Sequence, residues 1–61
     1  MDRHDGKVVH TRTYRGFEIR TFRQHSGRRT YDLYWPDSQI HSIAHESLRV
    51  AKAEIDAEVD R

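Results

Sequence analysis

The chain of 61 residues contains no cysteine, one proline and three glycines. Without cysteine it can form neither a disulfide framework nor a Cys-based zinc site. This composition fits a reducing compartment. Only 34% of the residues are apolar, and a chain of this length buries only about 60% of the surface that its unfolded form exposes. We therefore expect one small core.

Long apolar runs are also missing. No run approaches the roughly 18 residues that a membrane span needs, and residues 1–6 lack the apolar centre of a signal peptide. We expect a cytoplasmic protein that has no membrane partner. Residues 1–6 should be frayed, and residues 7–61 should form a single domain.

Charge is divided unevenly, although the formal net charge is only +1. Residues 7–34 contain seven Lys or Arg against two acidic residues, which gives +5. Residues 35–61 contain three against six, which gives −3, and residues 1–6 contribute −1. A basic first half of this kind points to a polyanion or an acidic partner.

The stretch from residue 17 to residue 35 predicts a β-hairpin. Residues 17–23 and 29–35 alternate, and the loop His25-Ser26-Gly27 suits a type I turn that ends on a left-handed glycine. This loop opposes Ile19 to Leu33 and Arg20 to Asp32. One face of the hairpin should then form the core, from Phe17, Ile19, Tyr31, Leu33 and Trp35.

Residues 8–13 are rich in β-branched side chains and predict a preceding strand. A second three-residue loop, Tyr14-Arg15-Gly16, would oppose Arg12 to Glu18 and place Lys7 beside Arg23. Arg12 with Glu18 and Arg20 with Asp32 would then form a ladder of ion pairs on the outer face. Residues 36–38 predict a turn. The sequence leaves open whether residues 39–43, which follow it, form a fourth strand.

The C-terminal segment predicts a helix. Ser47 is a suitable N-cap, and neither glycine nor proline follows it. Apolar residues recur at helical spacing at Leu48, Ala51, Ile55 and Val59, so this stripe should cover the core face of the sheet. The end past Val59 is acidic and opposes the helix dipole, so it should fray. The expected fold class is α+β, an antiparallel three- or four-stranded sheet packed against one C-terminal helix.

Two motifs support a resemblance. The segments YRGFxI, at residues 14–19, and SLxxAKxxID, at residues 47–56, resemble a pattern found among short uncharacterised bacterial and prophage proteins. The resemblance covers about three-quarters of the chain and implies the shape of a sheet with a C-terminal helix, without implying an activity. In layout alone, the chain is also similar to the arm-binding domain of tyrosine integrases, whose sheet enters the DNA major groove.

The main functional candidate is the cluster of basic residues at one end of the predicted sheet. Arginine and lysine bind phosphates by neutralising their charge and releasing counterions. The candidate nucleic-acid-binding residues are Lys7, Arg23, His25, Arg28 and Arg29. The alternative is a solvated tip whose charge prevents aggregation through the sheet edges. Arg15 contributes less, because its turn lies at the opposite end.

A second functional class is protein binding. With one helix available, the outer face should be exposed, and it would present Val8, Phe22 and Tyr34 beside His10, Arg12 and Thr30. Val8, Phe22 and Tyr34 could dock a host protein, as in a phage or prophage inhibitor of host nucleic-acid machinery. The same aromatics beside arginines could instead stack nucleic-acid bases. A second copy could also close an open sheet edge as a homodimer.

The sequence gives little support to a catalytic or a metal-binding function. Glu18 and Asp32 are each opposed to an arginine, which should keep them ionised rather than suited to general-acid work. His41 and His45 have a spacing seen in helical metal sites, but no Glu of an HExxH motif accompanies them. We therefore expect no enzyme activity, metal, cofactor or small-molecule substrate.

Overall fold

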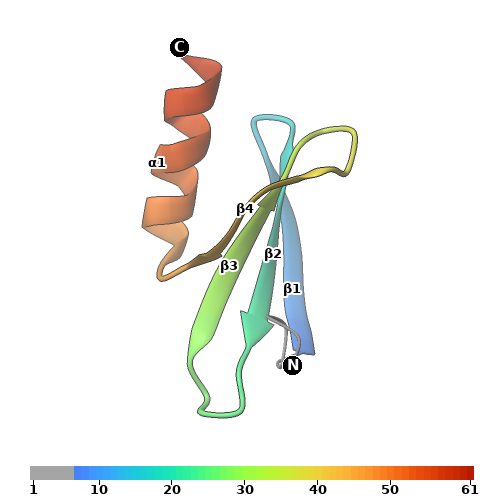
Figure 1. Ribbon diagram of the computed structural model, residues 1–61, viewed down its shortest axis with the longest axis vertical. Coiled ribbons are helices and arrows are strands. Elements are labelled where there is room, and N and C mark those ends of the chain that lie inside the picture. Colours follow the sequence, from blue (N-terminus) through green and yellow to red (C-terminus); the bar gives the residue numbers. More distant parts are fainter. Residues whose placement is uncertain (1–6) are drawn as a thin grey trace.

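The computed structural model describes residues 7–61, so the expected fraying of residues 1–6 lies outside the described residues. The elements are β1 (Lys7–Tyr14), β2 (Phe17–Arg23), β3 (Arg29–Tyr34), β4 (Ile40–His45) and α1 (Leu48–Val59). The strands form one antiparallel sheet in the order β1-β2-β3-β4, with α1 against one face (Figure 1). This confirms the α+β class, with four strands. Over residues 7–61, no helix is long and apolar enough to cross a membrane.

The β2–β3 hairpin has the predicted turn. The N–H of Gln24 donates to the carbonyl of Arg28 at 2.8 Å, and Gly27 has the expected positive φ of 88°. Ile19 therefore pairs with Leu33, and Arg20 with Asp32. Local turn chemistry alone determined this register.

The predicted β1–β2 turn was wrong by one residue. Only Arg15 and Gly16 form it, with φ of 50° and 89°, so Tyr14 pairs with Phe17 and Arg12 with Ile19. Positive φ at both positions is typical of a type I′ turn, whose twist matches the twist of the flanking strands. A shift of one residue moves every side chain of a strand to the other face. Arg12 and His10 therefore lie on the same face as the core, contrary to expectation.

A β-bulge then restores the predicted pairing at the start of β1. The register shifts between Val8 and His10, where Val9 is the extra residue. Beyond the bulge Val8 pairs with Phe22 and Lys7 with Arg23. The predicted neighbours Lys7 and Arg23 are confirmed, although a shorter turn and an inserted residue produce them together.

A buried carboxylate, Asp32 on β3, contacts the irregular part of the fourth strand. The N–H of Ala44 donates to Oδ1 of Asp32 at 2.8 Å, and Asp32 is only 1% exposed. Ala44 has a φ of 61°, within an irregular stretch where the β3–β4 register shifts. The carboxylate thus satisfies a backbone donor that the irregular ladder would otherwise leave unpaired.

The core lies between α1 and the sheet, as predicted. Its buried members are Phe17, Ile19, Leu33, Ala51 and Ile55, surrounded by Tyr14, Tyr31, Trp35 and Leu48. Ser47 is the N-cap, and its Oγ accepts the N–H of Val50 at 3.1 Å. The helix ends at Val59, and the N–H of its C-cap Asp60 donates to the carbonyl of Asp56 at 2.9 Å. The fraying expected past Val59 stays a prediction.

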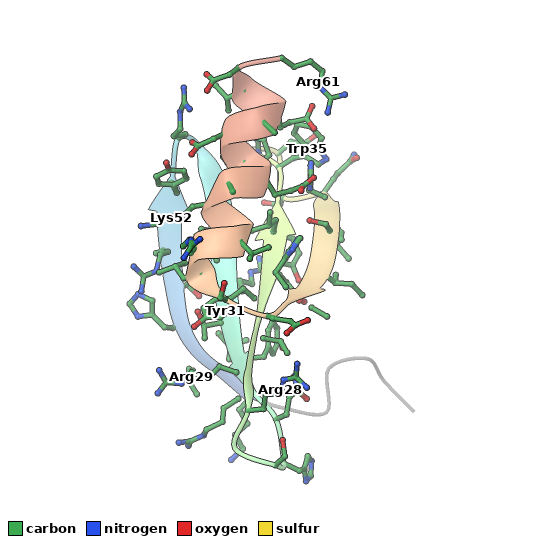
Figure 2. The ribbon with its side chains drawn as sticks, turned by 90° about the vertical axis from the view of Figure 1, so that its left-hand side faces the viewer. Arg28, Arg29, Tyr31, Trp35, Lys52 and Arg61 are labelled. Atoms are coloured by element: carbon green, nitrogen blue, oxygen red, sulfur yellow. The ribbon has the colours of Figure 1, made fainter. Side chains whose placement is uncertain are left out.

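The helix covers only part of the sheet. Its 12 residues span about 18 Å, whereas the longest dimension of the molecule is 35 Å. Figure 2 shows the first turn of α1 near Tyr31, with Arg29 and Arg28 beyond it toward the β2–β3 turn. The end of the sheet with that turn therefore has no helix over it.

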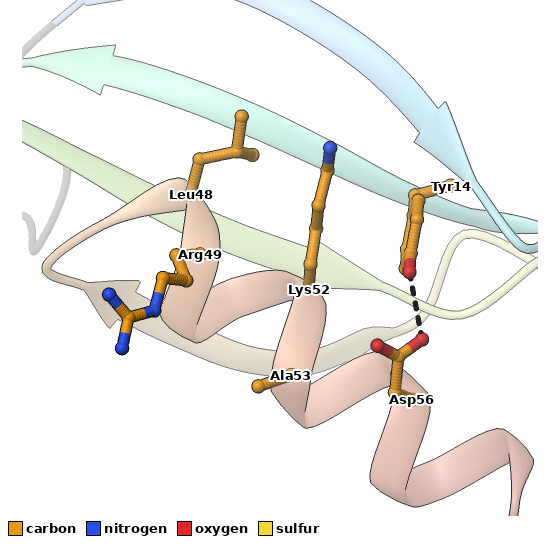
Figure 3. A pocket seen from close by; sticks show the side chains of 6 residues that line it. All are labelled: Tyr14, Leu48, Arg49, Lys52, Ala53 and Asp56. Carbon is orange, nitrogen blue, oxygen red and sulfur yellow. Dashed lines mark hydrogen bonds between the residues drawn. The ribbon is translucent and has the colours of Figure 1, made fainter.

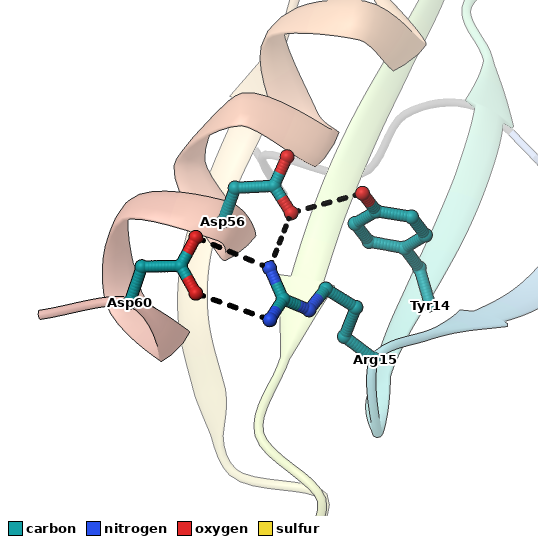
Figure 4. A network of polar contacts seen from close by, with 4 residues as sticks. All are labelled: Tyr14, Arg15, Asp56 and Asp60. Atoms are coloured by element: carbon teal, nitrogen blue, oxygen red, sulfur yellow. Dashed lines mark hydrogen bonds and ion pairs between the residues drawn. The ribbon is translucent and has the colours of Figure 1, made fainter.

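Polar contacts attach α1 to the opposite end of the sheet. The hydroxyl of Tyr14 donates to Oδ1 of Asp56 at 2.9 Å, beside a shallow groove along the helix (Figure 3). The guanidinium of Arg15 binds Asp56 at 3.0 Å and Asp60 at 3.1 Å (Figure 4). Hydrogen bonds from Arg15 and Tyr14 lower the pKa of Asp56 below its ordinary value. These contacts compensate for the unfavourable positive φ of Arg15.

Asp56→Asn should make stability less dependent on acid pH. A carboxylate with a lowered folded-state pKa stabilises the fold above its unfolded-state pKa of 3.8. That contribution is lost as the pH falls through the folded-state value. The Tm difference between wild type and Asp56→Asn should therefore be largest near neutral pH and shrink below about pH 4. The exposed Glu54→Gln on the same helix is the control, and an equal Tm difference at every pH would contradict the assignment.

Asp32→Ala should destabilise the protein by roughly 1–3 kcal/mol, because the N–H of Ala44 loses the buried carboxylate that accepts it. Asp32→Asn keeps an oxygen at the same place and should lose less. Urea unfolding followed by Trp35 fluorescence measures both variants. Equal stabilities for the two would show that the bond to Ala44 contributes little.

Candidate functional site

Three basic side chains form a line across the uncovered end of the sheet. Lys7 on β1 pairs with Arg23 on β2, and Arg23 pairs with Arg29 on β3. Directly opposed residues point to the same face, and here that is the face on which the helix lies. We call Lys7, Arg23 and Arg29 the basic row.

The basic row has no counter-charge within residues 7–61. All three side chains are exposed, and none of them has an ion pair or a side-chain hydrogen bond there. Like charges directly opposite one another on neighbouring strands destabilise a sheet. The row is therefore a concentrated positive site, which an anion would stabilise.

The other two predicted basic residues lie in the β2–β3 turn. Arg28 is exposed, and its Nη2 lies 3.5 Å from Oε1 of Glu46, a long contact between two exposed groups. An exposed pair of this kind contributes little free energy. His25 is also exposed at the turn. Arg28 thus places a further positive charge beside the basic row, and Glu46 partly offsets it.

Two further basic residues lie near the basic row, on the helix side of the sheet, although the sequence analysis predicted them on the outer face. His10 and Arg12 border a hollow on the helix side of the sheet, together with Val9, Thr21, Arg29 and Tyr31. We call this the sheet-face hollow. The signal that could have revealed it is the dipeptide Arg15-Gly16, which can form a two-residue turn and so shift β1 by one residue.

The remaining arginines of the first half have partners. Arg15 binds Asp56 and Asp60 at the far end of the sheet. Arg20 binds Glu18 on its own strand and stacks over the ring of Tyr34, with its Cζ 4.0 Å from the ring centroid. The hydrogen bond to Glu18 raises the pKa of Arg20. These two arginines therefore stabilise the fold.

The predicted ladder of ion pairs was wrong, although one of its registers was right. Arg20 opposes Asp32 but binds Glu18, because the carboxylate of Asp32 is buried and accepts the N–H of Ala44. Arg12 opposes Ile19, so it lies on the other face from Glu18. The shorter β1–β2 turn accounts for this difference.

The expected exposure of the outer face was also wrong. Phe22 is 6% exposed and Tyr34 is 7% exposed, whereas Val8 is 50% exposed. The guanidinium of Arg20 covers the ring of Tyr34. Of the three candidate protein-docking residues, only Val8 presents a large apolar surface to a partner.

Two histidines join a hydrogen-bonded chain between β4 and α1. Ser42 Oγ lies 3.0 Å from Nδ1 of His41 and 2.6 Å from Nε2 of His45, and Nε2 of His41 lies 3.2 Å from Oε1 of Glu58. The His41 ring also packs against Trp35, with a centroid distance of 4.7 Å. Among residues 7–61, no three His, Cys or acidic side chains are grouped to hold a metal ion. This row of hydrogen-bonded side chains therefore attaches the edge strand β4 to the helix.

A second groove follows the helix and the β1 edge. Its volume is about 470 Å³, and it is lined by Tyr14, Leu48, Arg49, Lys52, Ala53 and Asp56 (Figure 3). Lys52 Nζ lies 5.1 Å from the Tyr14 ring centroid. Asp56 is already occupied by Tyr14 and Arg15. The residues that line this groove thus serve to attach the helix to the sheet.

Comparisons with protein-family models, with curated proteins and with solved structures gave no match to this chain.

Proposed function

We propose that the chain is a non-enzymatic binding module that contacts the phosphate backbone of nucleic acid through the basic row. Arg28 and His25, at the β2–β3 turn, extend the contact surface. The observation that supports this most is the alignment of three exposed cations without a counter-charge in the described chain. A nucleic acid would relieve their repulsion and release its own condensed counterions on binding.

The distribution of acidic residues also favours nucleic-acid binding at the uncovered end of the sheet. Asp56 and Asp60 bind Arg15 at the end of the sheet opposite the β2–β3 turn. At the basic end, Glu46 lies 3.5 Å from Arg28, a contact between two exposed groups. A polyanion that approaches the uncovered end of the sheet would therefore meet mainly positive charge.

Protein binding through Val8, Phe22 and Tyr34 is the weaker proposal. The burial of Phe22 and Tyr34 leaves no broad apolar surface there for a host protein. The basic row, in contrast, is exposed and needs no rearrangement to contact a phosphate backbone. The function we propose involves no catalytic step, metal, cofactor or small-molecule substrate.

The double variant Lys7→Gln with Arg23→Gln tests this function. Fluorescence anisotropy with a labelled duplex should show binding at low salt that weakens steeply as salt is added. Each phosphate contact contributes a slope of about 0.9 in a plot of log affinity against log salt concentration, so the double variant should lower the slope by about two.

The matched control is Arg61→Gln, which removes an exposed cation at the opposite end of the molecule (Figure 2). Its salt slope should equal that of the wild type. Absence of binding at low salt would refute the proposed function. If Arg61→Gln lost half as much slope as the double variant, the loss per cation would be equal, which would show that net charge matters and that the position of the basic row does not.

A further inference from the structure

The sheet-face hollow lies directly beside the basic row. Its volume is about 300 Å³, at the lower end of the range for ligand pockets. His10, Thr21 and Tyr31 form one cross-strand line, and Arg29 of the basic row lies one line further toward the β2–β3 turn. The hollow exists because α1 begins at Leu48 and runs away from this end of the sheet. It is thus continuous with the surface that would contact phosphates.

The charge of the hollow suits an anion. Arg12 and Arg29 line it, and among residues 7–61 no acidic side chain does. Within residues 7–61 Arg12 has no ion pair, and its Nε is buried without a hydrogen-bond partner. A partly buried guanidinium without a counter-charge is unfavourable, so an anion in the hollow would stabilise Arg12 as well as bind to it.

The hollow also offers an aromatic surface. Tyr31 is half-buried against the core and lines the hollow, while Thr21 is buried beneath it. An arginine pair beside an aromatic ring is the combination with which proteins hold unpaired nucleotides, since the ring stacks on a base while the cations bind phosphate. The sequence suggested this combination for the outer face, whereas the structure has it on the helix side.

We propose that the sheet-face hollow holds one nucleotide unit of single-stranded nucleic acid. A phosphate binds between Arg12 and Arg29, and the adjoining base stacks on Tyr31. The inference rests on the proposed function, which it narrows from nucleic acid in general to unpaired strands. Bases in a duplex are stacked on one another and cannot reach Tyr31 without being extruded. Duplex binding would therefore use the basic row alone.

Tyr31→Leu tests the stacking. Anisotropy titrations with a short labelled oligothymidylate and with a labelled duplex should separate the two modes. Loss of the ring should weaken single-strand binding by about tenfold or more, and duplex binding should change by less than about twofold. Tyr31→Phe keeps the ring and should retain single-strand affinity, which separates stacking from a role of the hydroxyl.

Arg12→Gln is a second variant that does not depend on the packing of Tyr31. It should lower the salt slope for the oligothymidylate by about 0.7. Its Tm should equal or exceed that of the wild type, because the substitution removes a charge that has no counter-ion.

The results distinguish the two proposals. If neither single-stranded nor duplex nucleic acid binds at low salt, the proposed function and this inference both fail. If both forms bind through the basic row, but Tyr31→Leu and Arg12→Gln bind the oligothymidylate like the wild type, only the nucleotide site is refuted. An equal loss for duplex and single strand in Tyr31→Leu would also refute it.

Discussion

The attachment of one short helix to one end of the sheet determines the layout of this protein. Tyr14 and Arg15, at the β1–β2 turn, bind the end of α1: both contact Asp56, and Arg15 also contacts the C-cap Asp60. The N-cap Ser47 follows closely on β4, so the helix runs from the middle of the sheet toward that turn. Twelve residues cannot cover a molecule 35 Å long. The opposite end of the sheet therefore remains open.

This layout also separates the charges. The acidic residues at the end of α1 bind Arg15. Arg29 lies beyond the start of the helix (Figure 2), and the pairing of the strands places Arg23 and Lys7 in line with it. Although the net charge is only +1, one end of the molecule has paired charges, whereas the basic row at the other end has no counter-charge among residues 7–61. Phosphate binding at the unpaired end would require neither a conformational change nor a deep pocket, which suits a domain this small.

The register of β1 shows how a local change rearranges a surface. The two-residue turn at Arg15-Gly16 moves Arg12 and His10 to the helix side, and the bulge at Val9 then returns Lys7 to its place opposite Arg23. Without the bulge, Lys7 would lie on the other face, and the basic row would lose one of its three members. The hollow and the row therefore both depend on these two irregularities in β1.

The sequence by itself determined the elements whose signals are local. Gly27 specified the β2–β3 turn and with it the pairing of Ile19 with Leu33, and Ser47 specified the start of the helix. Tertiary structure alone decided which side Arg12 faces, because two-residue and three-residue loops both suit Arg15-Gly16. It also decided the partner of Asp32, since a buried carboxylate binds whichever donor the fold brings to it, here the N–H of Ala44.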